Sequence, residues 1–346
     1  MSEPSRAPRI HDVAKLAGVS TATVSRVLSK PEVVTEATRK AVEDAIAATG
    51  YIVNITARNL RQQQVGGVLA LVPNIANPFF SEILSGIARV LRPRGLNLLV
   101  VDTHAAPGEG PDASLSSYLN RARCDGVIVL DGALNAQLFT APGCPPVVQA
   151  CEWIDGLEAP RILADNVTGG RLVAEHLIGL GHRRILHLGG PPGNTLTISR
   201  RKGFVAALRE AGLEAEAQDP ALRAEGDFSV RSGHTAALRI AQMDERPTAV
   251  FCDSDEMALG LLQGLATSGL RVPDDVSIVG FDNIEMSAYA LPPLTTVRQR
   301  RGRLGGTAAE TLLAIIEGKE APTGETVLPV DLLVRNSTKQ LELPTD

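Results

Sequence analysis

The sequence predicts a small all-α N-terminal head, built on a helix-turn-helix pair, followed by an α/β body of two doubly wound parallel-sheet lobes. Two observations carry this prediction. Apolar residues follow helical spacing on both sides of a glycine within residues 10–28, and from residue 68 onward apolar strand-like runs alternate with helical stretches. Since these runs are too many for one small sheet and the 346 residues allow two or three folded units, we expect two lobes of similar size.

The stretch from residue 10 to residue 28 reads IHDVAKLAGVSTATVSRVL. Gly18 interrupts the apolar pattern, as a residue with positive φ does at a helix C-terminus, and Ser20 is a good N-cap for a second helix. The predicted apolar face of the first helix is Val13, Ala14, Leu16 and Ala17, and that of the second is Val24, Val27 and Leu28. The stretch therefore reads as two short helices joined by a tight turn.

The outward positions of the second helix carry small or hydroxylated side chains and one arginine. Such a surface can lie against DNA, donate hydrogen bonds to phosphates and place a guanidinium on a guanine edge. The candidate DNA contacts are Ser20, Thr21, Ala22, Thr23, Ser25 and Arg26. The alternative interpretation of this stretch alone is an ordinary helical hairpin.

A third helix is predicted from Thr35, which can cap it, to about residue 48, and Gly50 ends it. Residues 54–62, NITARNLRQ, form a separate element that is too short to be a stable helix alone, so a linker is the alternative interpretation. Paired with a symmetry mate on DNA this element could fold, and Leu60 between two arginines has the composition of a minor-groove wedge. We therefore predict a head at 8–52, a hinge at 53–65 and a body at 66–346.

Within the body, continuous apolar strands alternate with helices, which indicates parallel sheets covered on both faces. The strand-like runs are 68–72, 96–101, 126–131, 146–150, 162–165, 184–190, 248–253 and 277–282, and the helical stretches are 79–92, 166–180, 200–211, 230–243, 255–268 and 302–317. We expect lobe 1 at about 66–164 and 296–326, and lobe 2 at about 165–295 and 327–346.

Ligands of such sheets bind beyond the carboxyl ends of the strands. Among the residues that follow the predicted strands are aromatic, carboxylate and amide residues and one arginine. The residues in question are Pro73, Asn74, Asn77, Pro78, Phe79, Phe80, Asp102, Thr103, Gly189, Gly190, Asn194, Arg200, Asp253, Ser254, Asp255, Asp282 and Asn283. This chemistry suits a polar ring-shaped molecule such as a sugar or nucleoside. Taken singly, Asp165 and Asp255 could be helix caps, and the Gly189–Gly190 pair could be only a turn.

Charge and motif content narrow the function further. The net charge is −5, but residues 1–62 carry +3 and the remainder −8, which fits a DNA-binding head on a body that does not touch DNA. The sequence shows no signal peptide, membrane-spanning run, metal-type cysteine or histidine spacing, P-loop, GxSxG or HExxH. We therefore expect a cytoplasmic protein with reduced cysteines, no metal, no cofactor and no enzymatic activity.

Head, hinge and body together resemble LacI/GalR-type transcriptional regulators. The resemblance runs in order through IHDVAKLAGVSTATVSRVLS, TRKAVEDAIAATGY, NITARNLR, NPFFSEILSGI, DNVTGGRLVAEHLIGLGHRRILHLGG, RRKGFVAAL, PTAVFCDSDEMALG, VPDDVSIVGFDN and PPLTTVRQ, and covers nearly the whole chain. It implies a body of the periplasmic-binding-protein-like type I fold.

The resemblance also implies roles for individual residues. Thr21, Ala22 and Arg26 would face bases, and Ser20, Thr23 and Ser25 would lie nearer phosphates. In the hinge, Leu60 would be the wedge, Ala57 its close-packing neighbour and Asn54 a further DNA contact. The effector pocket would be lined by Phe79, Phe80, Asp165, Arg200, Phe228, Ser254, Asp282 and Gln299. Two positions depart from the family pattern, because Val53 replaces the usual proline before the hinge and Ser254 stands where asparagine is frequent.

The expected function is that of an effector-controlled transcription regulator, most often a repressor, that binds double-stranded DNA. Its C-terminal residues show no heptad repeat, so we expect a homodimer on a palindromic operator. The effector would be a small molecule, a sugar or related metabolite, bound between the lobes, and no membrane partner is expected. The alternatives are a solute-binding receptor of the transport type and an enzyme on the same sheet architecture.

Overall fold

The computed structural model describes residues 8–29, 31–51, 65–103 and 115–341. The chain divides into two compact units, residues 1–64 and residues 65–346, which are taken one after the other. The predicted hinge contacts Asn54, Ala57 and Leu60 lie outside the described residues. No helix in the described part is long and apolar enough to cross a membrane.

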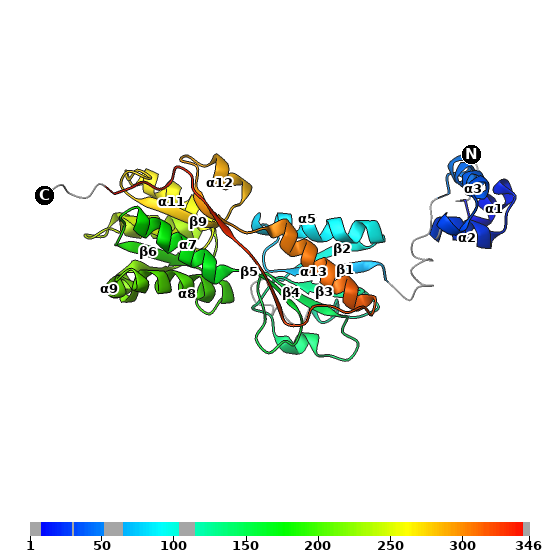
Figure 1. The fold of residues 1–346 in the computed structure, drawn as a ribbon, viewed down its shortest axis with the longest axis horizontal. Coiled ribbons are helices and arrows are strands. Elements are labelled where there is room, and N and C mark those ends of the chain that lie inside the picture. The colour runs from blue at the N-terminus through cyan, green and yellow to red at the C-terminus, as the bar shows by residue number, and fades with distance from the viewer. Residues whose placement is uncertain (1–7, 30, 52–64, 104–114, 342–346) are drawn as a thin grey trace, which may run out of the picture. The chain divides into compact units, whose positions relative to one another are not determined.

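In the described part of the first unit, three helices form the head (Figure 1). Its helices are α1 (Ile10–Ala17), α2 (Thr21–Ser29) and α3 (Glu36–Thr49), with a 3-10 turn η1 (Pro31–Val33) between the last two. Gly18 ends α1 with φ of 66°, and the Ser20 hydroxyl accepts a hydrogen bond from the Thr23 amide at 3.1 Å at the start of α2. The predicted turn and cap are confirmed, and they place α2 beside α1.

The core of the head is small and centres on the fully buried Val13, Val24 and Val42. The prediction for Leu16 was wrong, because this side chain is 58% exposed. Ile10, Val13, Ala14 and Ala17 already form the buried stripe of α1, and Leu16 falls outside that stripe on a helix of only eight residues.

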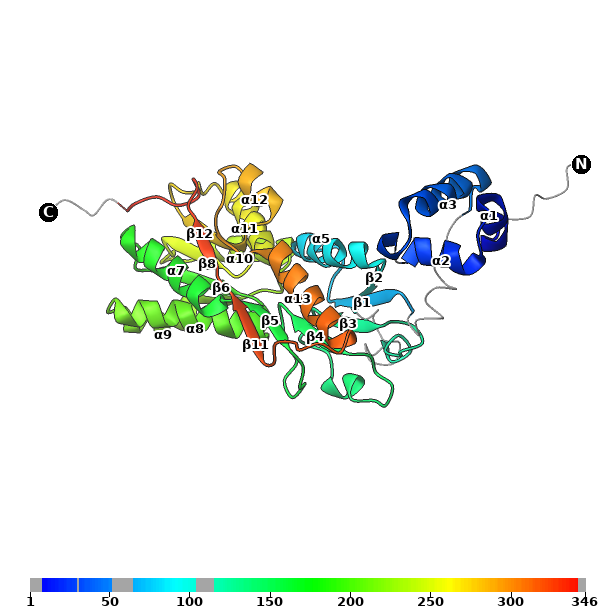
Figure 2. The ribbon, with the colours of Figure 1, turned by 45° about the vertical axis from the view of Figure 1, so that its right-hand side comes forward.

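Lobe 1 of the second unit is built on a six-stranded, fully parallel sheet. Its strands, in spatial order, are β11 (Glu325–Leu328), β5 (Arg161–Ala164), β4 (Val147–Ala150), β3 (Gly126–Val129), β1 (Gly67–Val72) and β2 (Asn97–Asp102). One face is covered by the paired helices α5 (Phe79–Leu91) and α13 (Arg301–Ile316) (Figure 2). The other face is covered by the segment 115–157, in which the structure describes a 3-10 turn, η3 (Ala136–Phe139), and irregular chain.

Lobe 2 repeats the plan with helices on both faces. Its strands, in spatial order, are β12 (Asp331–Leu333), β10 (Thr295–Arg298), β9 (Ser277–Asp282), β8 (Ala249–Cys252), β6 (Ile185–Gly189) and β7 (Arg223–Glu225). Helices α7 (Asn166–Gly179) and α8 (Thr195–Glu210) cover one face, and α10 (Val230–Ala241) and α11 (Asp255–Thr267) cover the other. Only β12 runs antiparallel to its neighbour, and α9 (Glu214–Gln218), α12 (Glu285–Tyr289), η2 (Arg92–Arg94) and η4 (Pro220–Leu222) complete the described elements.

The chain passes between the lobes after β5, after β10 and after β11. The predicted boundary at 295/296 falls inside β10, which pairs with β9 in lobe 2, and the boundary at 326/327 falls inside β11, which pairs with β5 in lobe 1. Both boundaries therefore lie a few residues too early, because these short strands carry no apolar run that marks which sheet they join.

Close helix pairing depends on glycine. A Cβ at Gly203 of α8 would lie 1.8 Å from the Val167 carbonyl oxygen of α7, and one at Gly170 of α7 would lie 2.0 Å from the Arg200 carbonyl oxygen. Since no side chain fits there, α7 and α8 pack backbone to backbone, and this contact sets the position of Arg200.

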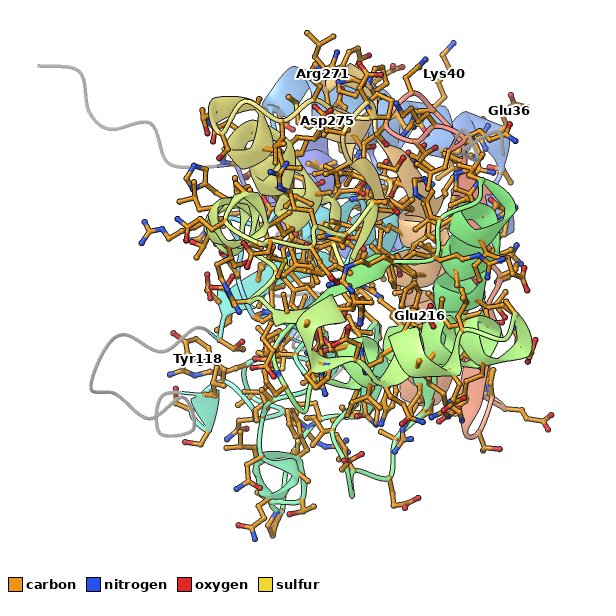
Figure 3. All side chains as sticks on the ribbon, turned by 90° about the vertical axis from the view of Figure 1, so that its left-hand side faces the viewer. Glu36, Lys40, Tyr118, Glu216, Arg271 and Asp275 are labelled. Carbon is orange, nitrogen blue, oxygen red and sulfur yellow. The ribbon has the colours of Figure 1, made fainter. Side chains whose placement is uncertain are left out.

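The outer surface carries exposed ion pairs, such as Arg271 Nε with Asp275 Oδ2 at 3.3 Å (Figure 3). Pairs of this kind contribute little to the stability of a fold.

Candidate functional site

Both sheets reverse their strand order at one point, and these two points face a common cavity. In lobe 1 the reversal lies between β1 and β3, and in lobe 2 it lies between β6 and β8. Ligands of open parallel sheets bind at such reversals, beyond the strand ends. The residues beyond these four strands include Asn74, Asp131, Asn194 and Ser254, and all four line the cavity.

The cavity has a volume of about 350 Å³ and is lined from both lobes. Its lining residues are Pro73, Asn74, Asn77, Phe79, Phe80, Asp131, Ala133, Glu152, Pro191, Asn194, Leu196, Arg200, Asp227, Phe228, Ser229, Ser254, Glu256 and Asp282. This volume falls in the range of small-molecule sites. The lining combines aromatic and other apolar side chains with carboxyl, amide and hydroxyl groups.

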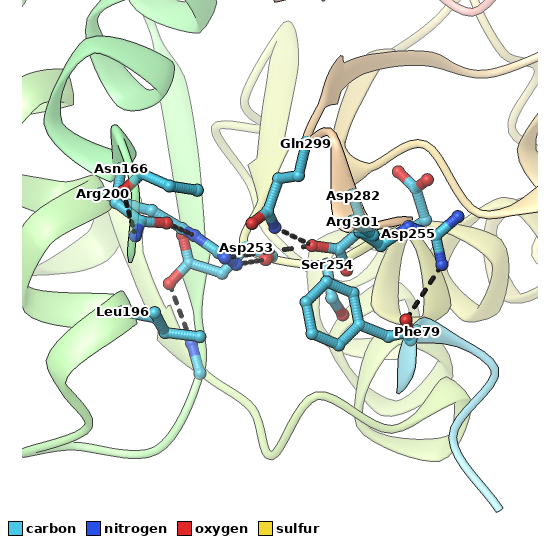
Figure 4. Close-up of polar contacts among 12 residues, drawn as sticks. Phe79, Asn166, Leu196, Arg200, Asp253, Ser254, Asp255, Asp282, Gln299 and Arg301 are labelled. Atoms are coloured by element: carbon cyan, nitrogen blue, oxygen red, sulfur yellow. Dashed lines mark hydrogen bonds and ion pairs between the residues drawn. The ribbon is translucent and has the colours of Figure 1, made fainter. Parts of the chain in front are cut away.

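Arg200 is held rigidly at the lobe 2 wall. It lies in the second turn of α8, which begins at Thr195 rather than at the predicted residue 200 because Asn194 caps it. Its Nε donates to Asn166 Oδ1 at 2.9 Å, and its Nη1 donates to the Asp253 carbonyl oxygen. The guanidinium lies 3.8 Å from the centre of the Phe281 ring, and Arg200 as a residue is 1% exposed. Figure 4 shows Arg200 beside Asn166 and Asp253. These contacts leave Nη2 as the guanidinium nitrogen without a hydrogen-bond partner among the described residues.

Asp282 lies beside Arg200, with Oδ1 3.9 Å from Arg200 Nη2. Burial raises the pKa of Asp282 to about 7, against the opposing charges of Arg200 and Arg301 and the hydrogen bond from Gln299. Gln299 Nε2 donates to Asp282 Oδ1 at 2.7 Å. The carboxyl is therefore oriented before any ligand arrives.

The remaining carboxylates of the cavity come from both lobes. In lobe 1, Asp131 accepts hydrogen bonds from the Thr103 hydroxyl at 2.5 Å and the Ala133 amide at 2.9 Å. Glu152 accepts a hydrogen bond from the Gly132 amide at 3.0 Å, and desolvation raises its pKa.

In lobe 2, desolvation also raises the pKa of Glu256, whose carboxylate has no partner among the described residues. At Asp227 desolvation acts in the same direction, but hydrogen bonds from Ser229 and Ser232 outweigh it and lower the pKa.

Aromatic side chains form the apolar part of the wall. Phe79 and Phe80 begin α5 and meet edge to face with ring centres 5.0 Å apart. Phe228 comes from lobe 2, has φ of 64°, and packs so closely on Gly190 that a Cβ there would lie 2.1 Å from its ring. Gly190 is thus required by the Phe228 ring, so the Gly189–Gly190 pair is more than a turn.

Arg301 links the two lobes behind the cavity. Its Nη1 donates to the carbonyl oxygen of Phe79 in lobe 1 at 3.0 Å (Figure 4). Its Nη2 donates to the carbonyl oxygen of Asn283 in lobe 2 at 3.0 Å. The side chain is 3% exposed. Because α13 and Phe79 both belong to lobe 1, a change of lobe orientation must break or remake the bond to Asn283.

Six of the eight predicted effector residues line the cavity, and two do not. Asp165 lies where the chain leaves lobe 1, and its carboxylate caps α7 by accepting hydrogen bonds from the Thr168 amide at 3.0 Å and the Thr168 hydroxyl at 2.7 Å. Gln299 lies at the second crossing and acts on the cavity through Asp282. Ser254 lines the cavity and also caps α11, since its hydroxyl accepts a hydrogen bond from the Met257 amide at 3.2 Å.

Sequence reasoning missed several lining residues. Asp131 and Glu152 follow β3 and β4, so the strand-end rule could have found both. Asp227 and Ser229 follow β7, a strand of three residues that shows no apolar run. Among the described residues, no three His, Cys, Asp or Glu side chains are arranged to hold a metal ion.

In the head, the structure places the predicted base contacts on the outer surface of α2. Thr21, Ala22 and Arg26 are exposed, and Thr23 and Ser25 are partly buried at its edge. The Ser20 and Thr23 hydroxyls lie 2.9 Å apart. This face presents hydroxyl donors and one guanidinium, as a DNA-reading helix does.

Comparison with known proteins agrees with both units. Residues 9–54 match the family of bacterial regulatory proteins of the lacI type, and residues 174–338 match a periplasmic binding protein-like domain. The transcriptional repressor CytR of Escherichia coli K12 is 37% identical over 97% of both chains.

Solved structures resemble nearly the whole chain, and two of them serve as examples. One is a lac repressor dimer bound to operator and the anti-inducer ONPF, with TM-score 0.81, 31% identity and coverage of 96% of this chain and 100% of the other. Another is the regulator CelR in complex with cellobiose, with TM-score 0.72, 32% identity and coverage of 95% and 99%. The chain thus belongs to the LacI family of bacterial regulatory proteins.

Proposed function

We propose that this protein is a transcriptional repressor that binds a palindromic operator as a homodimer and is controlled by a small molecule bound between its two lobes. The observation that carries the proposal is the cavity at the two strand-order reversals, in a chain whose head exposes the hydroxyl- and arginine-bearing face of α2. The relatives support it, because CytR is named a repressor and the lac repressor structure holds operator as a dimer.

The proposed DNA contacts are Ser20, Thr21, Ala22, Thr23, Ser25, Arg26, Asn54, Ala57 and Leu60. The proposed effector contacts are Phe79, Phe80, Arg200, Phe228, Ser254 and Asp282, and the cavity adds Asn74, Asp131, Glu152, Asn194, Asp227 and Glu256. Asp165 and Gln299 act in this proposal by positioning, the first as a helix cap and the second through Asp282.

Control follows from linkage between the two sites. If the effector binds one lobe arrangement more tightly than the other, it shifts the equilibrium between the two arrangements toward the first. The size of this shift is set by the difference between the two affinities. Arg301 joins Phe79 to the strand end at Asn283, so the lobe arrangement is coupled to a cavity wall. The change in operator affinity equals the coupling free energy, typically about 1–3 kcal/mol.

The test is selection of DNA from a random pool by the full-length protein, followed by gel-shift titration of the enriched sequence. A palindromic site bound as a dimer is the expected result. Absence of any enriched sequence would contradict the proposal and favour a solute-binding receptor with the same two-lobed body, or an enzyme. A repressor acting on chromosomal DNA works in the cytoplasm, and no enzymatic activity is proposed.

A further inference from the structure

We infer that the effector is an uncharged or positively charged ring compound rich in O–H or N–H donors, and that the cavity excludes phosphorylated and other anionic molecules. This inference rests on the proposed function and names the ligand class of the same site. It rests on three observations: the negative charge of the lining, the hydrogen bonds that Arg200 already makes within the protein, and the placement of the aromatic rings.

The lining is strongly acidic. It contains five carboxyl groups and one guanidinium. The carboxyl groups are Asp131, Glu152, Asp227, Glu256 and Asp282, and they come from both lobes, so a ligand meets acceptors on both sides. A phosphate group placed among them would be repelled and would lose its water without gaining a free cation.

Arg200, the cation of this lining, already binds acceptors within the protein. Two of its nitrogens donate to Asn166 and to the Asp253 carbonyl oxygen, and its charge is opposed by Asp282 at 3.9 Å. Only Nη2 lacks a hydrogen-bond partner in the described part of the chain, and it is fully buried. Bidentate capture of a phosphate uses two nitrogens of one guanidinium edge, and here both Nε and Nη1 already donate within the protein, so Nη2 alone is left to donate to hydroxyl or carbonyl oxygens of a ligand.

The free acceptor capacity points the same way. Glu256 is half-buried and makes no hydrogen bond or ion pair within the described chain, and Asp227 uses Oδ1 for both bonds from Ser229. Buried polar groups are normally paired, so the half-buried Glu256 carboxylate needs a donor from a ligand, whereas Asp227 is exposed and adds its negative charge to the lining. Hydroxyl, amide or ammonium groups meet that demand, and Phe79, Phe80 and Phe228 offer ring faces and edges to an apolar side of the ligand.

The experiment is calorimetric titration of the full-length protein with matched probes. The probes are cytidine with cytidine monophosphate, adenosine with adenosine monophosphate, and glucose and glucosamine with glucose 6-phosphate. We expect at least one unphosphorylated probe to bind, and its phosphorylated partner to bind about a hundredfold more weakly or not at all. A preference for glucosamine over glucose would identify a cationic ligand within the class.

Charge-neutral variants test the cause of the exclusion. Glu256→Gln and Asp227→Asn should each reduce the ratio of affinities for an unphosphorylated probe and its phosphorylated partner by about tenfold. Glu310→Gln, on the exposed surface of α13, should leave this ratio unchanged. Equal or tighter binding of a phosphorylated probe overturns the inference, as does failure of every unphosphorylated probe to bind. Gel shifts of the selected operator separate the two claims, because the proposed function stands if operator is bound while the ligand class fails.

Discussion

Replacement of Arg200 by methionine removes the guanidinium and keeps most of the apolar stem. The lost interactions are the bond to Asn166 Oδ1 at 2.9 Å, the bond to the Asp253 carbonyl oxygen and the contact with the Phe281 ring at 3.8 Å. Asn166 and Asp253 are buried, so their acceptors would find no water in place of the guanidinium. The change therefore tests a structural role that precedes ligand binding.

The magnitude follows from these contacts. Two hydrogen bonds to a charged donor are each worth about 1.5–3 kcal/mol, and removal of one partner of a buried charge pair costs about 3–5 kcal/mol. The cost at Asp282 is partly relieved, because loss of the Arg200 charge raises the pKa of this carboxyl further and it takes up a proton. We expect Arg200→Met to lower the free energy of unfolding of the body by about 3–5 kcal/mol at pH 7.

The assay is urea unfolding of the full-length protein followed by circular dichroism, with Lys202→Met as the matched control. Lys202 lies two residues along the same helix and is exposed, so its replacement should change the free energy of unfolding by less than about 0.5 kcal/mol. An Arg200→Met protein as stable as the Lys202→Met protein would refute a structural role for the Arg200 guanidinium. Loss of effector binding in the variant is expected in addition.

Four further predictions concern the head, the hinge, the helix pairing and pH. Arg26→Ala should weaken operator binding by about 1–3 kcal/mol in gel shifts and random-sequence binding much less, and an equal loss on both would mean a phosphate contact only. Leu60→Ala should reduce operator affinity and the DNA bend together, and unchanged bending would contradict a wedge. Gly203→Ala should destabilise the body by about 3 kcal/mol or more, since its Cβ would lie 1.8 Å from a carbonyl oxygen, whereas Gly179→Ala, with no atom within 4 Å, should be neutral or stabilising. The pKa of Asp282 in the folded protein is raised to about 7, so its contribution to stability is present below about pH 4 and is lost as pH rises to 7. This carboxyl can lower the free energy of unfolding by at most about 1.4 kcal/mol per pH unit over that window. Asp282→Asn should therefore make the free energy of unfolding, measured by urea titration, fall less steeply between about pH 4 and pH 7.

The sequence by itself predicted the features that depend on a single helix, strand or turn. Helical apolar spacing, Gly18 with its positive φ and the Ser20 cap predicted the two helices of the head, and continuous apolar runs predicted eight strands of the body. The rule that ligands bind beyond strand ends correctly placed Asn74, Asn194 and Ser254 in the cavity lining. Each of these inferences needs only neighbours along the chain.

Strand order and lobe crossing were decided by the tertiary structure alone. Strands β10 and β11 are four residues long and join different sheets, and no periodicity in so short a run records which partner accepts its hydrogen bonds. The same cause explains which cavity residues were missed or wrongly predicted. Asp227 was missed because it follows the three-residue strand β7. Asp165 and Gln299 lie where the chain crosses between the lobes, and there Asp165 caps α7 and Gln299 donates a hydrogen bond to Asp282. The type of a residue at a strand end determines which contacts its side chain can make. Only the packing of the two lobes determines which group that side chain contacts.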